Sequence, residues 1–199
     1  MTILVMKDLQ KLKVDFDGRK NLYVQVGQTS LIGGLMSKIY KVGFYGGKFM
    51  PLHKGHNYCI QKAAEQCEKV YVILFYGGDD EVEILKTSSE EYLSYEFRMN
   101  RLKEIAKQYD NVEISSIDVT SLKLPDGSED WDAETPLVLN ITGHMDAVYS
   151  SEPGYDNYFK RAYPWAVHIL VDPPRVVYPI SGTKIRNMKE EGEKKKWMI

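Results

Sequence analysis

Apolar and polar residues follow two alternating periods along the chain from Tyr40 onward. Short runs rich in Val, Ile and aromatic residues predict buried strands, and stretches with apolar residues three or four positions apart predict helices between them. The helix at residues 54–67, for example, places Ile60, Ala63 and Cys67 on one face. Strands are predicted at residues 41–45, 69–76, 111–119, 146–150 and 167–171, and further helices at residues 92–109, 155–163 and from about 182. This alternation predicts a doubly wound, Rossmann-like α/β domain with a parallel sheet.

Three segments do not follow this alternation. Residues 1–40 contain two strand-like runs around an Asp-Gly turn, so we predict a small N-terminal β-hairpin extension before the main domain at residues 41–199. An accessory packing arm is the favoured interpretation of the extension, and a role in partner binding or oligomer formation is the alternative. Residues 122–132 predict a loop over the carboxyl edge of the sheet, where ligands bind in such folds. The charged residues 189–196 predict a solvated helix end.

Composition limits the classes of function. At 199 residues with 43% apolar residues, the chain can fill the core of one sizeable domain. A formal net charge of −2 and a pI near 6.1 argue against a protein that coats nucleic acid. No apolar run approaches the roughly twenty residues that cross a bilayer, and no signal peptide is recognisable, so we expect a cytoplasmic protein without a membrane partner. Cys59 and Cys67 lack the spacing of a disulfide framework or a zinc site and are interpreted as packing residues.

The most informative stretch is residues 47–56, Gly-Lys-Phe-Met-Pro-Leu-His-Lys-Gly-His, directly after the first predicted strand. In such a turn the backbone N–H groups, the positive end of the following helix and two imidazoles point the same way, which suits a polyphosphate. His53 and His56 are three residues apart and therefore share one helix face. Gly46 and Gly47 are expected to allow backbone conformations closed to other residues and a close approach of phosphate oxygens.

Other interpretations of this stretch are weaker. A lone histidine is more often a surface or packing residue, which is the interpretation of His144 and His168. The stretch is not the phosphate-binding loop of kinases (Walker A), because its Gly-Lys pair is followed by Phe49. Lys48 and Lys54 either add positive charge to the anion site or are solvated surface residues.

A second candidate anion site opens the last predicted helix at residues 180–186, Ile-Ser-Gly-Thr-Lys-Ile-Arg. Ser181 is a good N-cap, Thr183 lies in the first turn, and Arg186 follows within about a turn. Alone, this segment would be a Ser-capped surface helix with an incidental arginine. Its occurrence together with residues 47–56 favours the anion site.

Both stretches resemble motifs of the nucleotidylyltransferase superfamily, whose members bind a triphosphate between a His-x-Gly-His loop and an Ile-Ser-x-Thr-x-Ile-Arg element. Residues 125–131, 149–152 and 171–175 extend the resemblance to the nicotinamide mononucleotide adenylyltransferase domain of NadR-type proteins, over roughly residues 41–190. The resemblance implies that the 5′-phosphate of nicotinamide mononucleotide (NMN) attacks the α-phosphorus of ATP, giving NAD and pyrophosphate. Residues 1–40 do not resemble the DNA-binding segment of the regulator forms, and the kinase segment is not seen, so neither activity is implied.

The resemblance also implies roles for individual residues. The catalytic residues would be His53, His56 and Arg186, as donors to the phosphates of the transition state. The ATP phosphates would be bound by Gly46, Gly47, Lys48, Phe49, Lys54, Ser181 and Thr183, adenosine by Tyr149, Ser150, Ser151, Asp172 and Arg175, and NMN by Trp131 and Arg98. For Trp131 the alternative is a packing role, and for Arg98 a place on the helix surface. Mg²⁺ would arrive on the ATP phosphates, so no metal-ligating residue is predicted.

Three other functions stay open at this point. An adenylyltransferase with phosphopantetheine or flavin mononucleotide as acceptor is the nearest, although phosphopantetheine enzymes typically carry Thr where this chain has His53. A nucleotide-sensing module without turnover would not demand His53, His56 and Arg186 together. A fragment of a class I aminoacyl-tRNA synthetase is disfavoured because the chain is short and acidic and lacks a Lys-Met-Ser-Lys-Ser loop. The choice between NMN and nicotinic acid mononucleotide is not predicted, and a homo-oligomer is left open.

Overall fold

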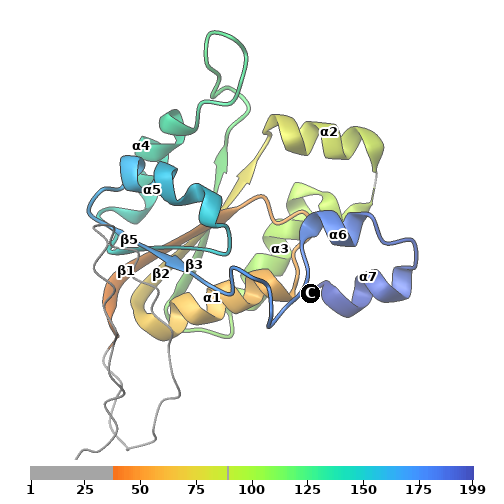
Figure 1. Cartoon of the computed structure of the whole chain (residues 1–199), viewed down its shortest axis with the longest axis horizontal. Helices are drawn as coiled ribbons and strands as arrows, with labels where there is room; N and C mark the ends of the chain where they lie inside the picture. Colours follow the sequence, from red (N-terminus) through yellow and green to blue (C-terminus); the bar gives the residue numbers. More distant parts are fainter. Residues whose placement is uncertain (1–37, 89) are drawn as a thin grey trace, which may run out of the picture. The chain divides into compact units, whose positions relative to one another are not determined.

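A central parallel sheet organises the structure, a computed structural model that describes residues 38–88 and 90–199 (Figure 1). Five strands pair in the order β3-β2-β1-β4-β5. They are β1 (Tyr40–Gly47), β2 (Cys67–Tyr76), β3 (Val112–Asp118), β4 (Ala147–Ser150) and β5 (Val167–Leu170). The four strand pairings of this sheet are all parallel, which confirms the doubly wound α/β prediction, and the strand order reverses between β1 and β4. The predicted N-terminal hairpin lies outside the described residues.

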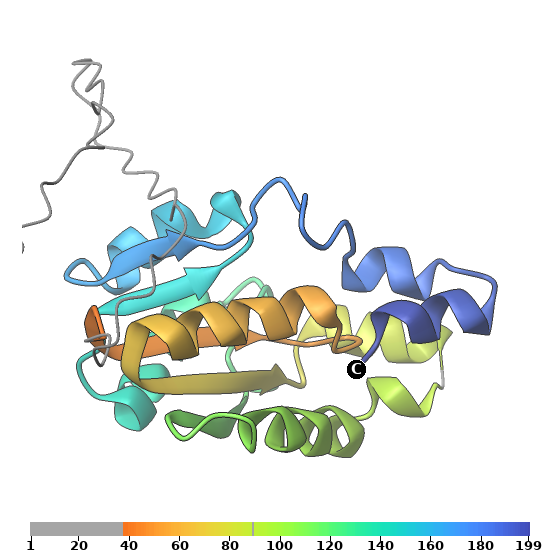
Figure 2. The same cartoon turned by 90° about the horizontal axis from the view of Figure 1, so that it is seen from below.

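Helices cover both faces of the sheet (Figures 1 and 2). Tyr45 of β1 belongs to a core shared with α1 and α3, whereas the next residue back, Phe44, belongs to a second core shared with α4 and α5. Successive residues of a strand point to opposite faces, so one strand serves both cores. The helices are α1 (Lys54–Gln66), α2 (Asp79–Thr87), α3 (Tyr95–Ala106), α4 (Trp131–Thr142), α5 (Asp156–Ala162), α6 (Gly182–Arg186) and α7 (Glu191–Trp197), with 3-10 turns η1 (Glu91–Leu93) and η2 (Pro153–Tyr155) before α3 and α5.

Two helices, α2 and α4, are missing from the sequence prediction. In α2 the buried residue is Glu81, while Val82 and Leu85 are exposed, so its apolar positions do not mark the inner face. In α4 a proline lies inside the helix, and Pro136 lacks the N–H group that a helix interior uses. The predicted loop at residues 122–132 therefore ends where Trp131 begins α4.

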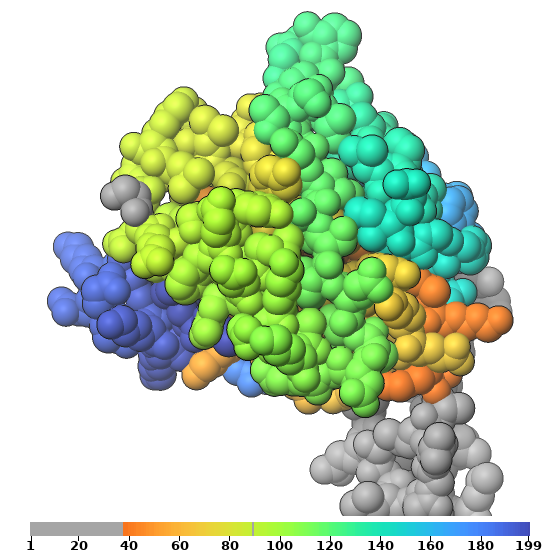
Figure 3. Space-filling model, turned by 180° about the vertical axis from the view of Figure 1, so that it is seen from behind, coloured from red at the N-terminus to blue at the C-terminus, as the bar shows by residue number. Residues whose placement is uncertain are grey.

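The segment between β3 and α4 stands out from the body of the domain (Figures 1 and 3). It contains a small hairpin closed by an antiparallel bridge between Lys123 and Glu129, with Gly127 at a φ of 88° at its tip. This confirms an excursion after the carboxyl end of β3, although its form is a hairpin and a helix start. None of the helices in the described part of the chain is long and apolar enough to span a membrane.

The last predicted helix consists of two short helices, α6 and α7. The prediction of a solvated charged tail is wrong for Lys194, which is 8% exposed and pairs with Glu191 at 2.8 Å and Glu90 at 3.5 Å. Its ammonium also lies 5.8 Å from the centre of the Tyr92 ring. Packing against the turn before α3 thus fixes α7 on the domain.

Candidate functional site

The turn between β1 and α1 lies at the carboxyl end of the central strand. The expected special backbone conformations of Gly46 and Gly47 are wrong, because both residues lie in β1 and neither has a positive φ. Gly46 is required for packing instead, since a Cβ there would lie 2.5 Å from a ring atom of Phe75. The left-handed residue of the turn is Phe49, with a φ of 52° and a ring that is 2% exposed. Burial of this ring anchors the turn to the core.

His53 and His56 begin helix α1 and cap it with their own rings. Nδ1 of His53 accepts the Gly55 N–H at 3.1 Å, and Nδ1 of His56 accepts the His53 N–H at 3.3 Å. The rings stack with their centres 3.6 Å apart and their planes at 21°. An imidazole whose Nδ1 accepts a hydrogen bond carries its proton on Nε2 when neutral. Each ring therefore offers one Nε2–H donor, and the cap sets its direction.

Both imidazoles are neutral at physiological pH. Burial, with a further contribution from the nearby positive charge of Arg175, lowers the pKa of His53 to about 4. Burial, then His53 and Arg175, holds the pKa of His56 well below its ordinary value. Loss of water disfavours the charged form of a histidine, and a neighbouring cation adds to this effect. The pair thus acts as hydrogen-bond donors without a formal charge.

The second motif is in direct contact with the first. Arg186 of α6 donates from Nη1 to the main-chain oxygen of Met50 and, at 3.2 Å from Nη2, to the hydroxyl of Thr183. Gly182 lies so close to the same turn that a Cβ would be 2.5 Å from the Met50 oxygen. Ser181 caps α6 by accepting the Lys184 N–H at 3.2 Å. Residues about 130 positions apart in the chain are therefore brought side by side, as the sequence predicts for a two-part anion site.

The loop after β5 brings Arg175 to the same place. Asp172, at a φ of 49°, accepts N–H groups of the next turn, including that of Val176 at 2.8 Å. Arg175 donates to the Ile180 oxygen at 2.6 Å and pairs with Glu152. A small pocket here is lined by His53, Gly55, Tyr58, Ser151, Val171, Asp172, Arg175, Tyr178 and Ile180. Residues predicted for phosphate and for adenosine thus line one pocket.

The other predicted adenosine residues point inward. Tyr149 is 1% exposed as a whole residue, and its hydroxyl donates to Gln66 at 2.9 Å, so neither its ring nor its main chain is open to a ligand. Ser150 is also buried, and its hydroxyl bonds with His168. The sequence motif marks the position of this turn correctly, but Ser151 is the residue of it that lines the pocket.

Arg98 lies in the interior of the domain. It is 0% exposed, pairs with Glu81 of α2, and donates from Nη1 to the main-chain oxygen of Lys48 at 2.6 Å. The arginine is therefore neither a surface residue of α3 nor open to solvent, and its contact with the turn before α1 is a supporting one. The Lys48 ammonium pairs with Asp80 at 2.9 Å, and Lys54 is an exposed residue of the first turn of α1.

Trp131 is the first residue of α4 and is 40% exposed. Its ring packs edge-on against Tyr155 and Tyr158, with ring centres 5.7 and 5.5 Å apart, and its Nε1–H donates to Glu129 at 3.3 Å. The aromatic cluster leaves part of the indole ring open to a ligand.

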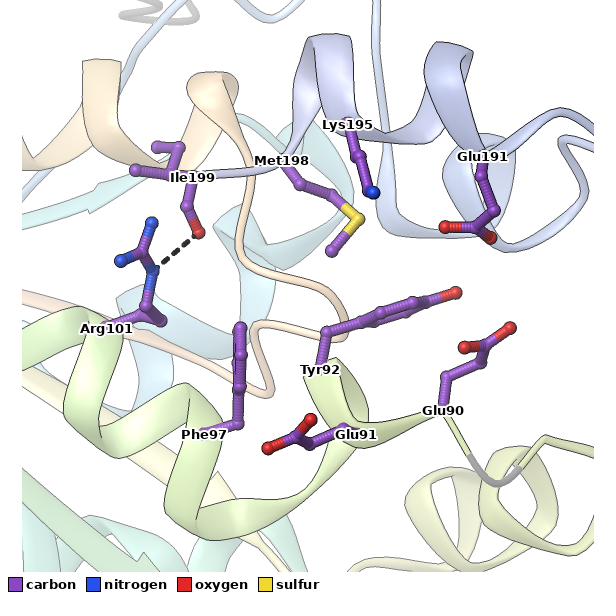
Figure 4. Close-up of a pocket in the computed structure, with 9 residues that line it drawn as sticks. All are labelled: Glu90, Glu91, Tyr92, Phe97, Arg101, Glu191, Lys195, Met198 and Ile199. Carbon is purple, nitrogen blue, oxygen red and sulfur yellow. Dashed lines mark hydrogen bonds between the residues drawn. The ribbon is translucent and has the colours of Figure 1, made fainter.

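One contact at His53 has no signal in the sequence. The backbone of His53 forms an antiparallel bridge with Met198, and Arg101 donates to the Ile199 oxygen at 2.9 Å (Figure 4). Beside these residues lies a cavity of about 440 Å³, with Tyr92 and Phe97 on the side opposite Met198. Main-chain hydrogen bonds require no particular side chain, so the sequence gives no sign that the C-terminal residues support His53, the N-cap of α1.

Comparison with known proteins identifies the family. The family model described as cytidylyltransferase-like matches residues 44–188. The chain belongs to this family. It is 27% identical over 152 residues to the trifunctional NAD biosynthesis/regulator protein NadR of Escherichia coli strain K12. The matched region covers 73% of this chain and 36% of that protein. It is 32% identical over 76 residues to the phosphopantetheine adenylyltransferase of Clostridium perfringens strain SM101, covering 38% of this chain and 41% of the relative.

Solved structures agree on the fold. A NadR protein in complex with NAD and AMP-PNP superposes with a TM-score of 0.56 at 23% identity, over 81% of this chain and 46% of that one. The domain therefore has the Rossmann-like nucleotidylyltransferase fold, and the chain spans less than half the length of the NadR proteins it matches. Within residues 38–88 and 90–199, no group of three His, Cys, Asp or Glu side chains is arranged to hold a metal ion.

Proposed function

We propose that this domain is an adenylyltransferase that joins NMN to the adenylyl group of ATP, forming NAD and releasing pyrophosphate. The observation that carries the proposal is the contact of Arg186 with the turn that holds His53 and His56. It provides two neutral donors and a guanidinium around one turn, which is what a triphosphate requires. The similarity to NadR proteins, one of them solved with NAD, supports the nicotinamide acceptor.

The reaction needs alignment of two anions rather than activation of a nucleophile. An oxygen of the NMN phosphate forms a bond to the α-phosphorus of ATP while the bond from that phosphorus to the α,β-bridging oxygen breaks. Pyrophosphate leaves with the electron pair of that bond. Because the attacking phosphate is already anionic near neutral pH, no side chain has to remove a proton from it.

Each part of the site then has one task. The Nε2–H groups of His53 and His56 donate to phosphate oxygens as negative charge develops on them in the transition state. Arg186, with Ser181 and Thr183, holds the β- and γ-phosphates that leave. The main chain at residues 46–49 and the Lys48 and Lys54 ammonium groups add donors to the triphosphate. Mg²⁺ would arrive on the ATP phosphates and would neutralise charge on their oxygens, with no dedicated set of ligands among the residues that the structure describes.

The two nucleoside ends lie on either side of the phosphates in this proposal. Ser151, Asp172 and Arg175 take adenosine. They lie beside His53 around a hollow of only about 10 Å³, so their position and not a preformed cavity supports this role. The open part of the Trp131 ring stacks on the nicotinamide, since a pyridinium ring is a cation and an indole face attracts cations. Arg98, which is too buried to contact NMN, instead supports the turn at Lys48 whose main chain faces the triphosphate in this proposal.

Phosphopantetheine is the second candidate acceptor. The similarity to the Clostridium perfringens enzyme supports it, although that match covers only 38% of this chain. Histidine at position 53 and the tryptophan at position 131 favour NMN. Both candidates share the chemistry at the α-phosphate and differ only in the acceptor.

The test is pyrophosphate release by the purified chain with ATP and one acceptor at a time: NMN, nicotinic acid mononucleotide, phosphopantetheine or flavin mononucleotide. We expect turnover with NMN and a loss of at least about 100-fold in kcat for His56→Ala, since one transition-state donor contributes on this scale. His144→Ala is the control, because His144 is exposed and stacks on Trp165. Turnover with phosphopantetheine alone would contradict the NMN proposal. Equal activity of His56→Ala and the parent would contradict catalysis by this site.

A further inference from the structure

A buried serine, a buried histidine side chain and a half-exposed aspartate are joined in a row away from His53 and His56. The Ser150 hydroxyl lies 2.8 Å from Nε2 of His168, and Nδ1 of His168 lies 3.2 Å from a carboxylate oxygen of Asp156. The three residues come from β4, β5 and the start of α5. The His168 side chain is 4% exposed. None of the roles described above uses His168 or Asp156.

The direction of these hydrogen bonds follows from the chemistry of the groups. An ionised carboxylate only accepts, so Nδ1 of His168 carries the proton and donates to Asp156. Nε2 of the neutral ring then accepts from the Ser150 hydroxyl. With its proton used, the Ser150 oxygen accepts the main-chain N–H of Glu152 at 3.2 Å. In this arrangement the Glu152 N–H donates to Ser150, Ser150 donates to Nε2 of His168, and Nδ1 of His168 donates to Asp156. The Glu152 main-chain oxygen, 3.3 Å from the Ser150 oxygen, is the more distant alternative acceptor for the hydroxyl.

The surroundings of His168 favour its neutral form. Asp156 and Lys160 of α5 are the charged groups that act on the ring, and the Phe159 ring packs edge-on with centres 4.9 Å apart. Burial lowers the pKa of His168 more than Asp156 raises it. Asp156 is kept ionised, since bonds from Lys160 and His168 lower the pKa of its carboxyl.

The same three residue types form the nucleophilic site of many hydrolases, but this group is built for another task. Ser150 is 5% exposed, and its oxygen is engaged by the Glu152 N–H, so a substrate carbonyl has no approach to it. What the hydroxyl does is hold the turn at residues 150–152. That turn carries Ser151, which lines the pocket beside His53, and Glu152, which pairs with Arg175.

We propose that Asp156, His168 and Ser150 form a positioning relay that holds the 150–152 turn, and through it Ser151 and Arg175, in place for the adenosine end of ATP. This role deepens the proposed function and rests on it for the identity of the nucleotide. The three residues do not touch the substrate. They hold in place the main chain at residues 150–152 and the Arg175–Glu152 ion pair, which face the nucleotide in this proposal. Supporting hydrogen bonds orient binding residues in this way.

Two variants at position 168 separate this role from general packing. The carbonyl oxygen of a glutamine can take the place of Nε2 and accept from Ser150, whereas an asparagine is shorter and replaces only Nδ1, next to Asp156. Both remove the ring and the titration. We expect His168→Asn to weaken ATP binding about 10-fold, the effect of about one lost hydrogen bond, and His168→Gln to stay within about twofold of the parent.

The measurements are the affinity for AMP-PNP by calorimetry and the KM values for ATP and NMN. The proposal expects a higher KM for ATP, an unchanged KM for NMN and a similar kcat for His168→Asn and for Ser150→Ala. Thermal unfolding of each variant checks that it is folded. Equal AMP-PNP affinity of His168→Asn and the parent, or an equal loss in His168→Gln and His168→Asn, would overturn the relay.

A further outcome concerns Ser150 as a nucleophile. Labelling of the parent chain by a fluorophosphonate, abolished in Ser150→Ala, would replace the positioning role with a catalytic one. Failure of the relay and failure of the proposed function are distinguishable. A parent that binds AMP-PNP but turns over no acceptor contradicts the adenylyltransferase, and the affinities of the two His168 variants still decide the relay.

Discussion

Residues 180–186 pack so closely against the turn before α1 that one methyl group added at Gly182 should have a large effect on activity. A Cβ added at Gly182 would lie 2.5 Å from the Met50 oxygen and 3.2 Å from Nη1 of Arg186. Carbon and oxygen atoms rarely approach within about 3.3 Å, so Gly182→Ala must separate α6 from the turn by roughly 0.8 Å. The atom that the new methyl group would meet is the main-chain oxygen of Met50, and a main-chain atom cannot rotate away as a flexible side chain would.

This separation should affect activity more than stability. Overpacking of this kind costs about 1–3 kcal/mol, part of which relaxation of a short surface helix relieves. A displacement near 1 Å in a site that aligns reacting groups costs on the order of 100-fold in rate. We therefore expect Gly182→Ala to lower kcat/KM for ATP by about 10- to 100-fold with a modest loss of thermal stability.

Gly192→Ala is the matched control for this experiment. Gly192 is an exposed residue of α7, and a Cβ there would meet no atom within 4 Å. Alanine in a helix is favoured over glycine by about 1 kcal/mol, so this variant should keep parental kinetics and gain slightly in stability. Steady-state kinetics and thermal unfolding of both variants give the answer. Parental kinetics in Gly182→Ala would refute the idea that the distance between the motifs sets activity.

Three further predictions concern stability and charge. His53 alone should remove up to about 3 kcal/mol of unfolding free energy as the pH falls from about 6.5 to about 4, because it binds a proton only in the unfolded chain over this range; His56, whose pKa is also lowered, adds to the loss. His53→Asn keeps an N-cap acceptor but does not titrate, so it should reduce the dependence of the unfolding free energy on pH, measured by urea titration at several pH values. An unchanged pH dependence would contradict the buried His53 as its cause. Arg98→Met should cost about 3–5 kcal/mol because it leaves the buried Glu81 carboxylate without a cationic partner, with only the Gly77 N–H still bonded to it. Adding Glu81→Gln should recover part of that loss, and strict additivity of the two changes would argue against the ion pair. Lys48→Ala should change stability by less than about 1 kcal/mol, since its pair with Asp80 is at the surface, but raise the KM for ATP; no change in KM would remove Lys48 from the phosphate site.

The parts of the fold that the sequence predicted are those with strong periodic signals. The strands and α1 carry apolar residues at the spacing of their buried faces, and the His-x-Gly-His turn follows directly from the first of them. Helix α2 gives no such signal, because its inner face holds Glu81, whose partner Arg98 lies on another helix. A buried ion pair looks like two surface residues in a sequence.

The site shows the same limit at the level of single residues. His53, His56 and Arg186 were singled out by two motifs that resemble those of the nucleotidylyltransferase superfamily, and the structure brings Arg186 onto the turn that precedes the two histidines. Their hydrogen-bond partners were not, since the caps involve main-chain groups and the contact of Arg186 is with a backbone oxygen. Burial excludes both interpretations of Arg98 that the sequence offered, a surface position and direct contact with a ligand, and only the three-dimensional arrangement reveals that burial.

The self-capping of α1 has a consequence for how nucleotides meet this site. Each imidazole is already oriented by a main-chain N–H before any ligand arrives, and the two stacked rings leave each other little freedom to turn. The entropy of ordering these donors is lost when the chain folds, so binding does not have to supply it. The same bonds make the start of α1 depend on the two histidines. If the proposed function holds, selection for a stable domain and selection for a prepared phosphate site act on the same two side chains.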